Sequence, residues 1–299
     1  MNSIDYLTVD VFTRTRFAGN PLAVVLDAEG LDGAVMQTVA REFNLAETVF
    51  VLPAEKPSHR ARLRIFTPAA ELPFAGHPTV GTAVLLNRID GAGAREFVLE
   101  EAIGPIRCTT ASIDSDRGQA RFQLARLPEE VGPAAGADKI ATALGLEDGD
   151  IGFGGFKPAC WSAGVPLSFV PVRGLQQISR CQPNLAYWGA AFGEGGHSAA
   201  YVFCRETVER GSAFHARMFA PRLGIMEDPA TGAGAAAFAG VLAHFAPPPD
   251  GDHEFSIEQG YEMDRPSLIG LSVTIRNRQL AVAAISGEAI TVSEGTIEA

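Results

Sequence analysis

Three short segments of the chain recur, in the same order, in its second half. The matching pairs are FAGNPLAVVL (17–26) with SAGVPLSFVPV (162–172), RIFTP (64–68) with RMFAP (217–221), and HPTVGTA (77–83) with DPATGAG (228–234). One such match alone has little weight, but three in the same order at an offset of about 150 residues are typical of an internal repeat. The 299 residues suffice for two domains of that size, so the sequence predicts two similar halves.

Each half combines predicted strands with helices. YLTVDVF, PLAVVLD and RLRIF have strand character in the first half, as LSFVPV, AAYVFC and SAFHARMF have in the second. Residues 32–43 carry apolar side chains with helical spacing after Asp32, a candidate N-cap. This pattern predicts an α/β fold. We expect domains over 1–118 and 119–299, and the last strand is a candidate to return to the first domain.

The helix after each repeated turn is rich in small residues. AGHPTVGTAVLL and ATGAGAAAFAGVL carry Gly, Ala and Thr in their first turns, and small side chains allow a sheet to surround a helix closely. The N-terminus of such a helix presents backbone N–H groups and the positive end of the helix dipole, which favour an anion. A small anionic substrate is therefore expected, although tight packing alone is an alternative explanation for the small residues.

A glutamate interrupts the apolar segment FNLAETVFVL (43–52). In a strand, Leu45, Glu47, Val49 and Val51 share one face, because side chains alternate with period two. An anionic carboxylate is costly to bury on such a face, so either this face meets water or the glutamate has a chemical role. Desolvation by Leu and Val should raise the pKa of Glu47, which suits a group that accepts a proton and returns it.

Composition and charge exclude several other classes of protein. The net charge of −11 disfavours a nucleic-acid partner, which attracts basic surfaces. The sequence lacks a run of roughly 18 apolar residues for a membrane span, and MNSIDYLTVDVF lacks the features of a signal peptide. The four cysteines form no CxxC pair, and the six histidines lack metal-ligand spacing. We therefore expect a cytoplasmic, metal-free protein that binds neither nucleic acid nor a membrane.

Longer motifs identify a family. DVFTRTRFAGNPLAVV, FNLAETVFV, RIFTPAAELPFAGHPTVGTA, RMFAPRLGIMEDPATG and QGYEMDRPS together resemble the PhzF family of phenazine-biosynthesis-like isomerases, although Asp264 replaces a common glycine in the last motif. The resemblance implies a diaminopimelate-epimerase-like fold of two similar domains. By the same resemblance, each domain would be a curled, mostly antiparallel sheet around a central helix, with the active site in the interdomain cleft. It also implies a homodimer and a cofactor-free isomerisation of a small cyclic amino acid, trans-2,3-dihydro-3-hydroxyanthranilate.

The resemblance assigns catalytic roles to three residues. The matching motifs make Glu47 the single general acid and base, with His77 and Asp228 beside it at the site. His77 and Asp228 occupy equivalent places in the two repeats, each just before a proline. There they would hydrogen-bond the substrate's amine or hydroxyl group. A structural alternative is that Asp228 caps the helix that follows it.

The substrate carboxylate is expected to bind backbone groups. By the same resemblance, Gly76 in one half and Gly232 with Ala233 in the other would hold it. Asn20, in the AGNP turn, is either a left-handed turn residue or a further contact. This chain carries Ala46 and Ala233 where the family commonly has serine, so two hydroxyl donors are missing from the inferred site.

Other functions stay open at this point. Epimerases of this superfold use two thiols, but AGHPT and PATGA contain no cysteine, so a one-base proton shift is favoured over a two-thiol racemase. A racemase with a non-thiol second base is one alternative, and a non-catalytic ligand-binding or regulatory protein is another. Gly232, Gly234 and Ala237 match G-x-G-x-x-A, but the strand and acidic residue of a dinucleotide site are missing. No cofactor is therefore expected.

Overall fold

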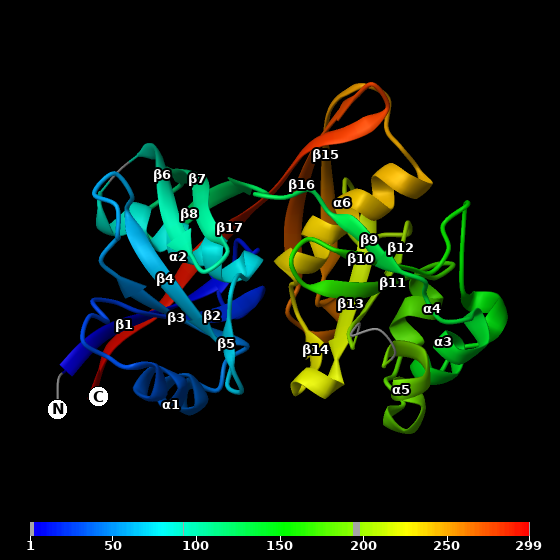
Figure 1. Cartoon of the computed structure of the whole chain (residues 1–299), viewed down its shortest axis with the longest axis horizontal. Helices are drawn as coiled ribbons and strands as arrows, with labels where there is room; N and C mark the ends of the chain where they lie inside the picture. The colour runs from blue at the N-terminus through cyan, green and yellow to red at the C-terminus, as the bar shows by residue number, and fades with distance from the viewer. Residues whose placement is uncertain (1–2, 92, 194–197, 299) are drawn as a thin grey trace. The chain divides into compact units, whose positions relative to one another are not determined.

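The computed structural model describes residues 3–91, 93–193 and 198–298, which form two compact units (Figure 1). The first unit comprises Met1–Ala125 and Ile285–Ala299, and the second comprises Arg126–Ala284. The boundary expected after residue 118 lies inside a strand of the first unit, and the end of the chain belongs to that unit. Among the described residues, no helix is both long and apolar enough to cross a bilayer.

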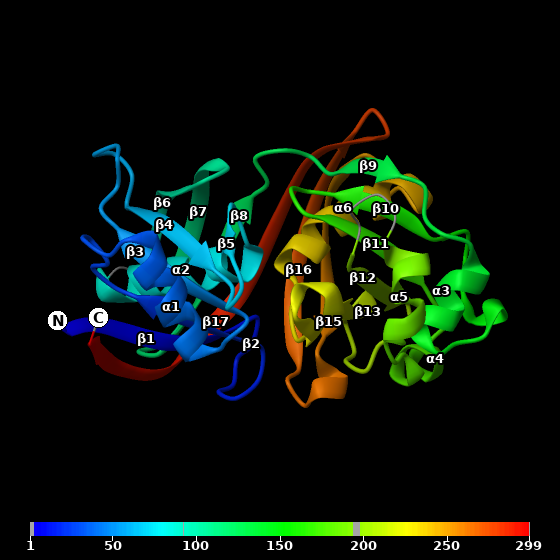
Figure 2. The ribbon, with the colours of Figure 1, turned by 60° about the horizontal axis from the view of Figure 1, so that its bottom comes forward.

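The described residues of the first unit form two helices and a set of strands. The helices are α1 (Gly33–Phe43) and α2 (Gly76–Ile89), and the strands are β1 (Ser3–Val11), β2 (Asn20–Val25), β3 (Glu47–Leu52), β4 (Ala61–Phe66), β5 (Glu71–Leu72), β6 (Ala94–Glu101), β7 (Gly104–Ser112) and β8 (Arg117–Gln123). The last strand, β17 (Gln279–Glu298), begins in the second unit and ends in the first. It pairs antiparallel with β1, so the two ends of the described chain lie side by side (Figure 2).

The second unit has more helices. They are α3 (Ala137–Leu144), α4 (Leu175–Arg180), α5 (Leu185–Phe192) and α6 (Gly232–Phe245). Its strands are β9 (Glu129–Gly132), β10 (Ala159–Ser162), β11 (Pro166–Pro171), β12 (Ala200–Cys204), β13 (Phe214–Ala220), β14 (Ile225–Asp228), β15 (Gly251–Gln259) and β16 (Ser267–Arg276). The mixed α/β class predicted from the sequence is confirmed.

The strand pairings of the first unit recur in the second. In the first, β2 pairs parallel with β3, β3 antiparallel with β4, β4 parallel with β6, and β6 antiparallel with β7. In the second, β11–β12, β12–β13, β13–β15 and β15–β16 repeat these directions in the same order. The short strands β5 and β14 pair antiparallel with β4 and β13. The two similar halves predicted from the internal repeat are thus confirmed.

Helices α2 and α6 are the repeated central helices, each 14 residues long and buried over most of its length. Helix α2 contacts strands on several sides, β1, β2, β3, β6, β7 and β8 among them. Its small residues are needed for this packing. A Cβ atom on Gly81 would lie 2.7 Å from Val11 Cγ2 and 2.8 Å from Leu22 Cδ2, both closer than van der Waals contact. In α6, a Cβ atom on Gly234 would lie 2.6 Å from the ring of Tyr201.

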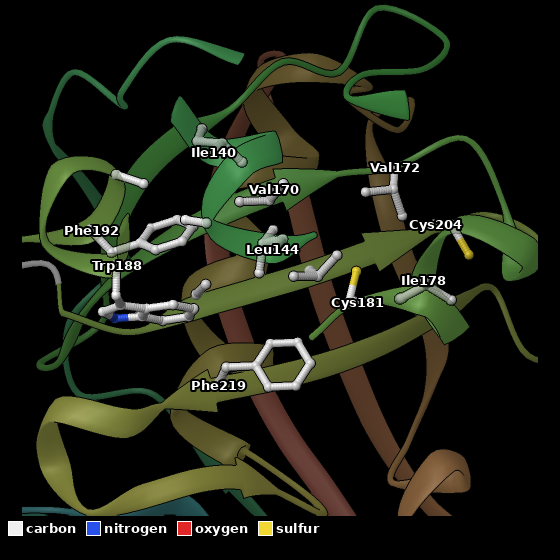
Figure 3. Close-up of a cluster of buried hydrophobic side chains, with 14 residues drawn as sticks. Ile140, Leu144, Val170, Val172, Ile178, Cys181, Trp188, Phe192, Cys204 and Phe219 are labelled. Carbon is white, nitrogen blue, oxygen red and sulfur yellow. The ribbon is translucent and has the colours of Figure 1, made fainter. Parts of the chain in front are cut away.

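Outer helices cover the sheets away from the central helices. In the first unit, α1 begins after Asp32, whose carboxylate accepts hydrogen bonds from the backbone N–H groups of Ala34 and Val35, so the predicted N-cap is confirmed. In the second unit, α3, α4 and α5 pack onto β11, β12 and β13 through a buried apolar cluster that includes Trp188 and Phe219 (Figure 3). These three helices were not predicted from the sequence.

Candidate active site

Glu47 is the first residue of β3, and its side chain is 13% exposed. It lies in register with Leu22 on the parallel neighbour β2. The rest of β3, residues 48–52, is buried, as is usual for strands in parallel pairs covered on both faces. The sheet face that carries Glu47 is therefore not a wet surface, and the explanation of Glu47 as an ordinary exposed strand residue is wrong.

His77, the second residue of α2, lies directly beside Glu47. It is 3% exposed, and its Nε2 atom is 3.1 Å from Glu47 Oε2, a close contact whose angle falls outside that of a hydrogen bond. Burial lowers the pKa of His77 to about 3. The imidazole is therefore neutral near pH 7 and carries one N–H group.

Asn20 faces the other ring nitrogen of His77. Its Nδ2 atom lies 3.4 Å from His77 Nδ1. An amide nitrogen can only donate, so Nδ1 accepts and the ring proton resides on Nε2, toward Glu47. Asn20 is fully buried and begins strand β2. The left-handed conformation of this turn belongs to Gly19, with φ of +67°, so the interpretation of Asn20 as a left-handed residue is wrong.

A second buried carboxyl group lies at the start of α2, which Gly76 begins. Glu101, the last residue of β6, accepts a hydrogen bond of 2.7 Å at Oε1 from the hydroxyl of Thr79. Burial raises the pKa of Glu101 to about 8, although the Thr79 bond acts in the opposite direction. Sequence reasoning missed Glu101. The signal that revealed Glu47, a glutamate on the apolar face of a strand, is also present here, because Leu99 and Glu101 share the buried face of β6.

Asp228 is the last residue of β14 and is 8% exposed. Its Oδ2 atom accepts a hydrogen bond of 2.6 Å from the hydroxyl of Thr231, the N-cap residue of α6. Asp228 therefore precedes the cap position and is not the helix cap that the alternative explanation required. Gly232 and Ala233 form the first two positions of α6, where backbone N–H groups lack a partner within the helix.

Gln259 joins this turn to the end of β15. Its Nε2 atom donates to the backbone carbonyl of Asp228 at 2.7 Å and to Thr231 Oγ1 at 3.0 Å, and its Oε1 atom accepts from the Thr231 N–H at 3.2 Å. Gln259 begins the segment QGYEMDRPS (259–267), which continues into a tight turn where Asp264 has φ of +55°. A glycine adopts this left-handed conformation most readily, and aspartate is one of the few residues that tolerate it. The glycine common at this position thus has a conformational reason.

A charged cluster lies on the other side of β15. His215 is fully buried, with Nδ1 2.8 Å from Glu258 Oε1 and Nε2 3.0 Å from Glu262 Oε1. Burial alone would lower the pKa of His215, but the two carboxylates raise it to about 9. Nearby, Arg217 forms a bidentate pair with Glu227, the residue before Asp228. Arg217, Glu227 and Glu262 lie within the segments RMFAPRLGIMEDPATG and QGYEMDRPS, but the sequence did not show that they meet His215 and Glu258.

The cysteines do not provide an acid–base pair. Cys108, Cys160, Cys181 and Cys204 are all buried, and burial raises the pKa of each thiol. They are therefore protonated near neutral pH, where a thiol has little nucleophilic or basic character.

Known proteins match this sequence along its whole length. The family model of the phenazine biosynthesis-like proteins, PhzC-PhzF, matches residues 9–295. An uncharacterized isomerase of Mesorhizobium japonicum is 50% identical over 301 residues, which cover 99% of each protein. The trans-2,3-dihydro-3-hydroxyanthranilate isomerase of Pseudomonas fluorescens is 32% identical over 302 residues, which cover 98% of this chain and 99% of that protein.

Solved structures share the fold. A PhzF-family protein of Bacillus anthracis has a TM-score of 0.89 at 26% identity, with 100% of both chains covered. A probable proline racemase of Agrobacterium radiobacter shares the fold alone, with a TM-score of 0.64 at 15% identity over 99% of this chain and 93% of that one. The two units with central helices therefore define a protein of the epimerase-like fold. More narrowly, the chain belongs to the PhzF family, as its motifs predicted, and it is an isomerase.

Proposed function

We propose that the protein moves a proton within a small unsaturated carboxylate, without a cofactor, and that Glu47 is the single general acid and base. The observation that carries this proposal is the buried contact of 3.1 Å between Glu47 Oε2 and His77 Nε2, because burial favours the neutral imidazole. A histidine whose pKa is about 3 neither holds nor releases a second proton near pH 7. Of the two adjacent side chains, the carboxylate is thus the one that can shuttle a proton.

The chemistry needs only one such group. The Glu47 carboxylate takes a proton from one carbon, the electrons shift along the conjugated system, and the new carboxylic acid returns the proton to a second carbon. Substrate and product have the same atoms, so nothing else is consumed. His77, with its proton on Nε2, would donate a hydrogen bond to the substrate and would orient it beside the Glu47 carboxylate.

The remaining predicted residues have binding roles in this proposal. Asp228 would accept hydrogen bonds from an amine or hydroxyl group of the substrate. The backbone N–H groups of Gly76, and those of Gly232 with Ala233, would bind its carboxylate, because helix N-termini favour anions. Asn20 acts through His77, whose tautomer it selects. Since 32% identity links the chain to a trans-2,3-dihydro-3-hydroxyanthranilate isomerase, that compound is the first candidate substrate.

The proposal is tested by proton exchange in D₂O, followed by NMR, on dihydro-hydroxyanthranilate and a panel of small unsaturated carboxylic and amino acids. Glu47→Gln keeps the size of the side chain and removes the base, so exchange should fall by about 10²- to 10⁴-fold. Glu96→Gln is the matched control, because Glu96 lies on β6 with a side chain 51% exposed, and it should exchange like wild type. Equal exchange in wild type and Glu47→Gln would contradict the role of Glu47. Binding of a compound without any exchange would favour a non-catalytic ligand-binding protein.

A further inference from the structure

One buried amide fixes the turn that carries Asp228. Gln259 is fully buried and makes the three hydrogen bonds described above, two to Thr231 and one to the backbone of Asp228. A buried amide left without partners costs more free energy than a hydrogen bond normally contributes. The amide therefore has a strong preference for this one arrangement of the turn.

The chemistry of its partners determines the orientation of this amide. A backbone N–H can only donate and a backbone carbonyl can only accept. Since the Thr231 N–H faces Oε1 and the Asp228 carbonyl faces Nε2, the amide cannot be reversed. The second N–H of Gln259 then points at Thr231 Oγ1, which must accept it.

The hydrogen bond from Gln259 to Thr231 determines the direction of the bond between Thr231 and Asp228. Because Thr231 Oγ1 accepts from Gln259, its own proton is available for Asp228 Oδ2, 2.6 Å away. A hydroxyl that donates to a carboxylate favours the ionised form of the acid. Gln259 thus acts on the Asp228 side chain through Thr231, and on its backbone directly.

The strand end that carries Gln259 is itself held in place. The preceding residue, Glu258, bonds His215, and Glu262 in the following turn bonds the other nitrogen of the same ring. Glu258 also accepts from the backbone N–H groups of Val208 and Glu209. These bonds lie within the second unit and keep both sides of Gln259 fixed. The amide is therefore a rigid support and not a mobile side chain.

We propose that Gln259 is a positioning residue, which orients the Asp228 carboxylate through Thr231 so that it accepts a hydrogen bond from the substrate. This inference rests on the proposed function, in which Asp228 anchors the substrate. Because that contact would exist before and during the proton shift, losing it weakens ground state and transition state alike. The expected signature is a raised KM with kcat nearly unchanged.

Four variants test the hydrogen bonds from Gln259 through Thr231 to Asp228 separately. Gln259→Leu removes all three bonds, and Gln259→Glu keeps the acceptor but removes both donors. Thr231→Val removes the hydroxyl, and Thr231→Ser keeps it. We expect the first three to lower kcat/KM by about 10- to 100-fold, the equivalent of one hydrogen bond to a charged group. Thr231→Ser should stay close to wild type, and the Gln259→Leu/Thr231→Val double variant should be no worse than either single variant.

A stability control distinguishes positioning from a merely structural role. Ser272 is buried in β16 and its hydroxyl donates to the Glu254 carboxylate, so Ser272→Ala removes a bond of the same type elsewhere in the unit. It should lower the melting temperature yet leave KM unchanged. The Kd of anthranilate, a stable aromatic carboxylate, is measured by calorimetry for every variant and should rise with KM.

The outcomes are distinct. If Gln259→Leu and Thr231→Val lower only the melting temperature, while KM and the anthranilate Kd match wild type, Gln259 is structural and the inference is overturned. The Thr231 pair decides the question even if the Gln259 variants do not fold. Wild-type protein that neither exchanges protons in the panel nor binds anthranilate would overturn the proposed function itself, and the inference with it.

Discussion

Glu101 should make the stability of the protein depend on pH in an unusual direction. Its carboxyl group is 7% exposed, and within the part of the chain that the structure describes its Oε2 atom has no hydrogen-bond partner. At Oε1 it meets the hydroxyl of Thr79, which is also 2.8 Å from the Ala75 carbonyl. With one proton, Thr79 cannot donate fully to both. A single donor that is shared with a backbone carbonyl compensates a buried carboxylate poorly, so burial favours the protonated, neutral form of Glu101.

The magnitude follows from the pKa. Burial raises the pKa of Glu101 from 4.5 to about 8, and each unit corresponds to about 1.4 kcal/mol. Since the folded state binds the proton more tightly, this group's contribution is fully present below pH 4.5 and is lost as pH rises through about 8. The loss amounts to at most about 5 kcal/mol. Glu101→Gln, a neutral isostere, should remove this dependence and be more stable than wild type near pH 8.

The assay is urea unfolding followed by circular dichroism at several pH values between 4.5 and about 8. Wild-type stability, relative to Glu101→Gln, should fall by about 1.4 kcal/mol per pH unit. Glu96→Gln, on the exposed side of the same strand, is the control and should follow wild type. Infrared spectra at neutral pH should show a protonated-carboxyl band that Glu101→Gln lacks. Parallel stability profiles for wild type and Glu101→Gln, without that band, would refute the reasoning.

Two further predictions concern other buried sites. His215→Gln should flatten the pH dependence of the stability of the second unit between pH 6.5 and about 9. The raised pKa of His215 beside Glu258 gives a stabilising contribution that is present at low pH and lost as pH rises through about 9. Tryptophan fluorescence during thermal unfolding measures this stability, and an unchanged dependence on pH in the variant would contradict the prediction. Gly81→Ala should destabilise by about 1–3 kcal/mol, since the new methyl group would overlap Val11 and Leu22. Urea unfolding tests this, and a gain in stability, as helix propensity alone would give, would show that these side chains move aside.

Sequence patterns predicted those parts of the fold that depend on residues close together along the chain. The internal repeat predicted the duplicated topology because each copy of the motif forms the same strands and central helix. The polar interruption of an apolar strand drew attention to Glu47, and the same rule applied to β6 would have found Glu101. By contrast, α3 and α5 are only 8 residues long, too short for a periodic pattern to stand out.

The contacts around Asp228 were beyond sequence reasoning. Gln259 lies 28 residues from Thr231, and His215 lies 43 from Glu258, so no local spacing joins them. The approach of such pairs depends on strand register, which a single sequence does not reveal. The roles of Glu47, His77 and Asp228 stay predictions, as do the homodimer and the cytoplasmic location.

The pairing of β17 with β1 affects the order in which the two units can be completed during synthesis. It pairs with β1 from Ser3–Glu298 to Val11–Ala289, so residues from both ends of the described chain complete the first unit. On the ribosome, β1 emerges before the second unit and lacks this neighbour until that entire unit has been synthesised. During that time one edge of β1 has unpaired backbone groups, a template for wrong pairing. The second unit, encoded as an uninterrupted segment, can fold first. The first unit, although its strand β1 is synthesised before the second unit, is therefore completed after it.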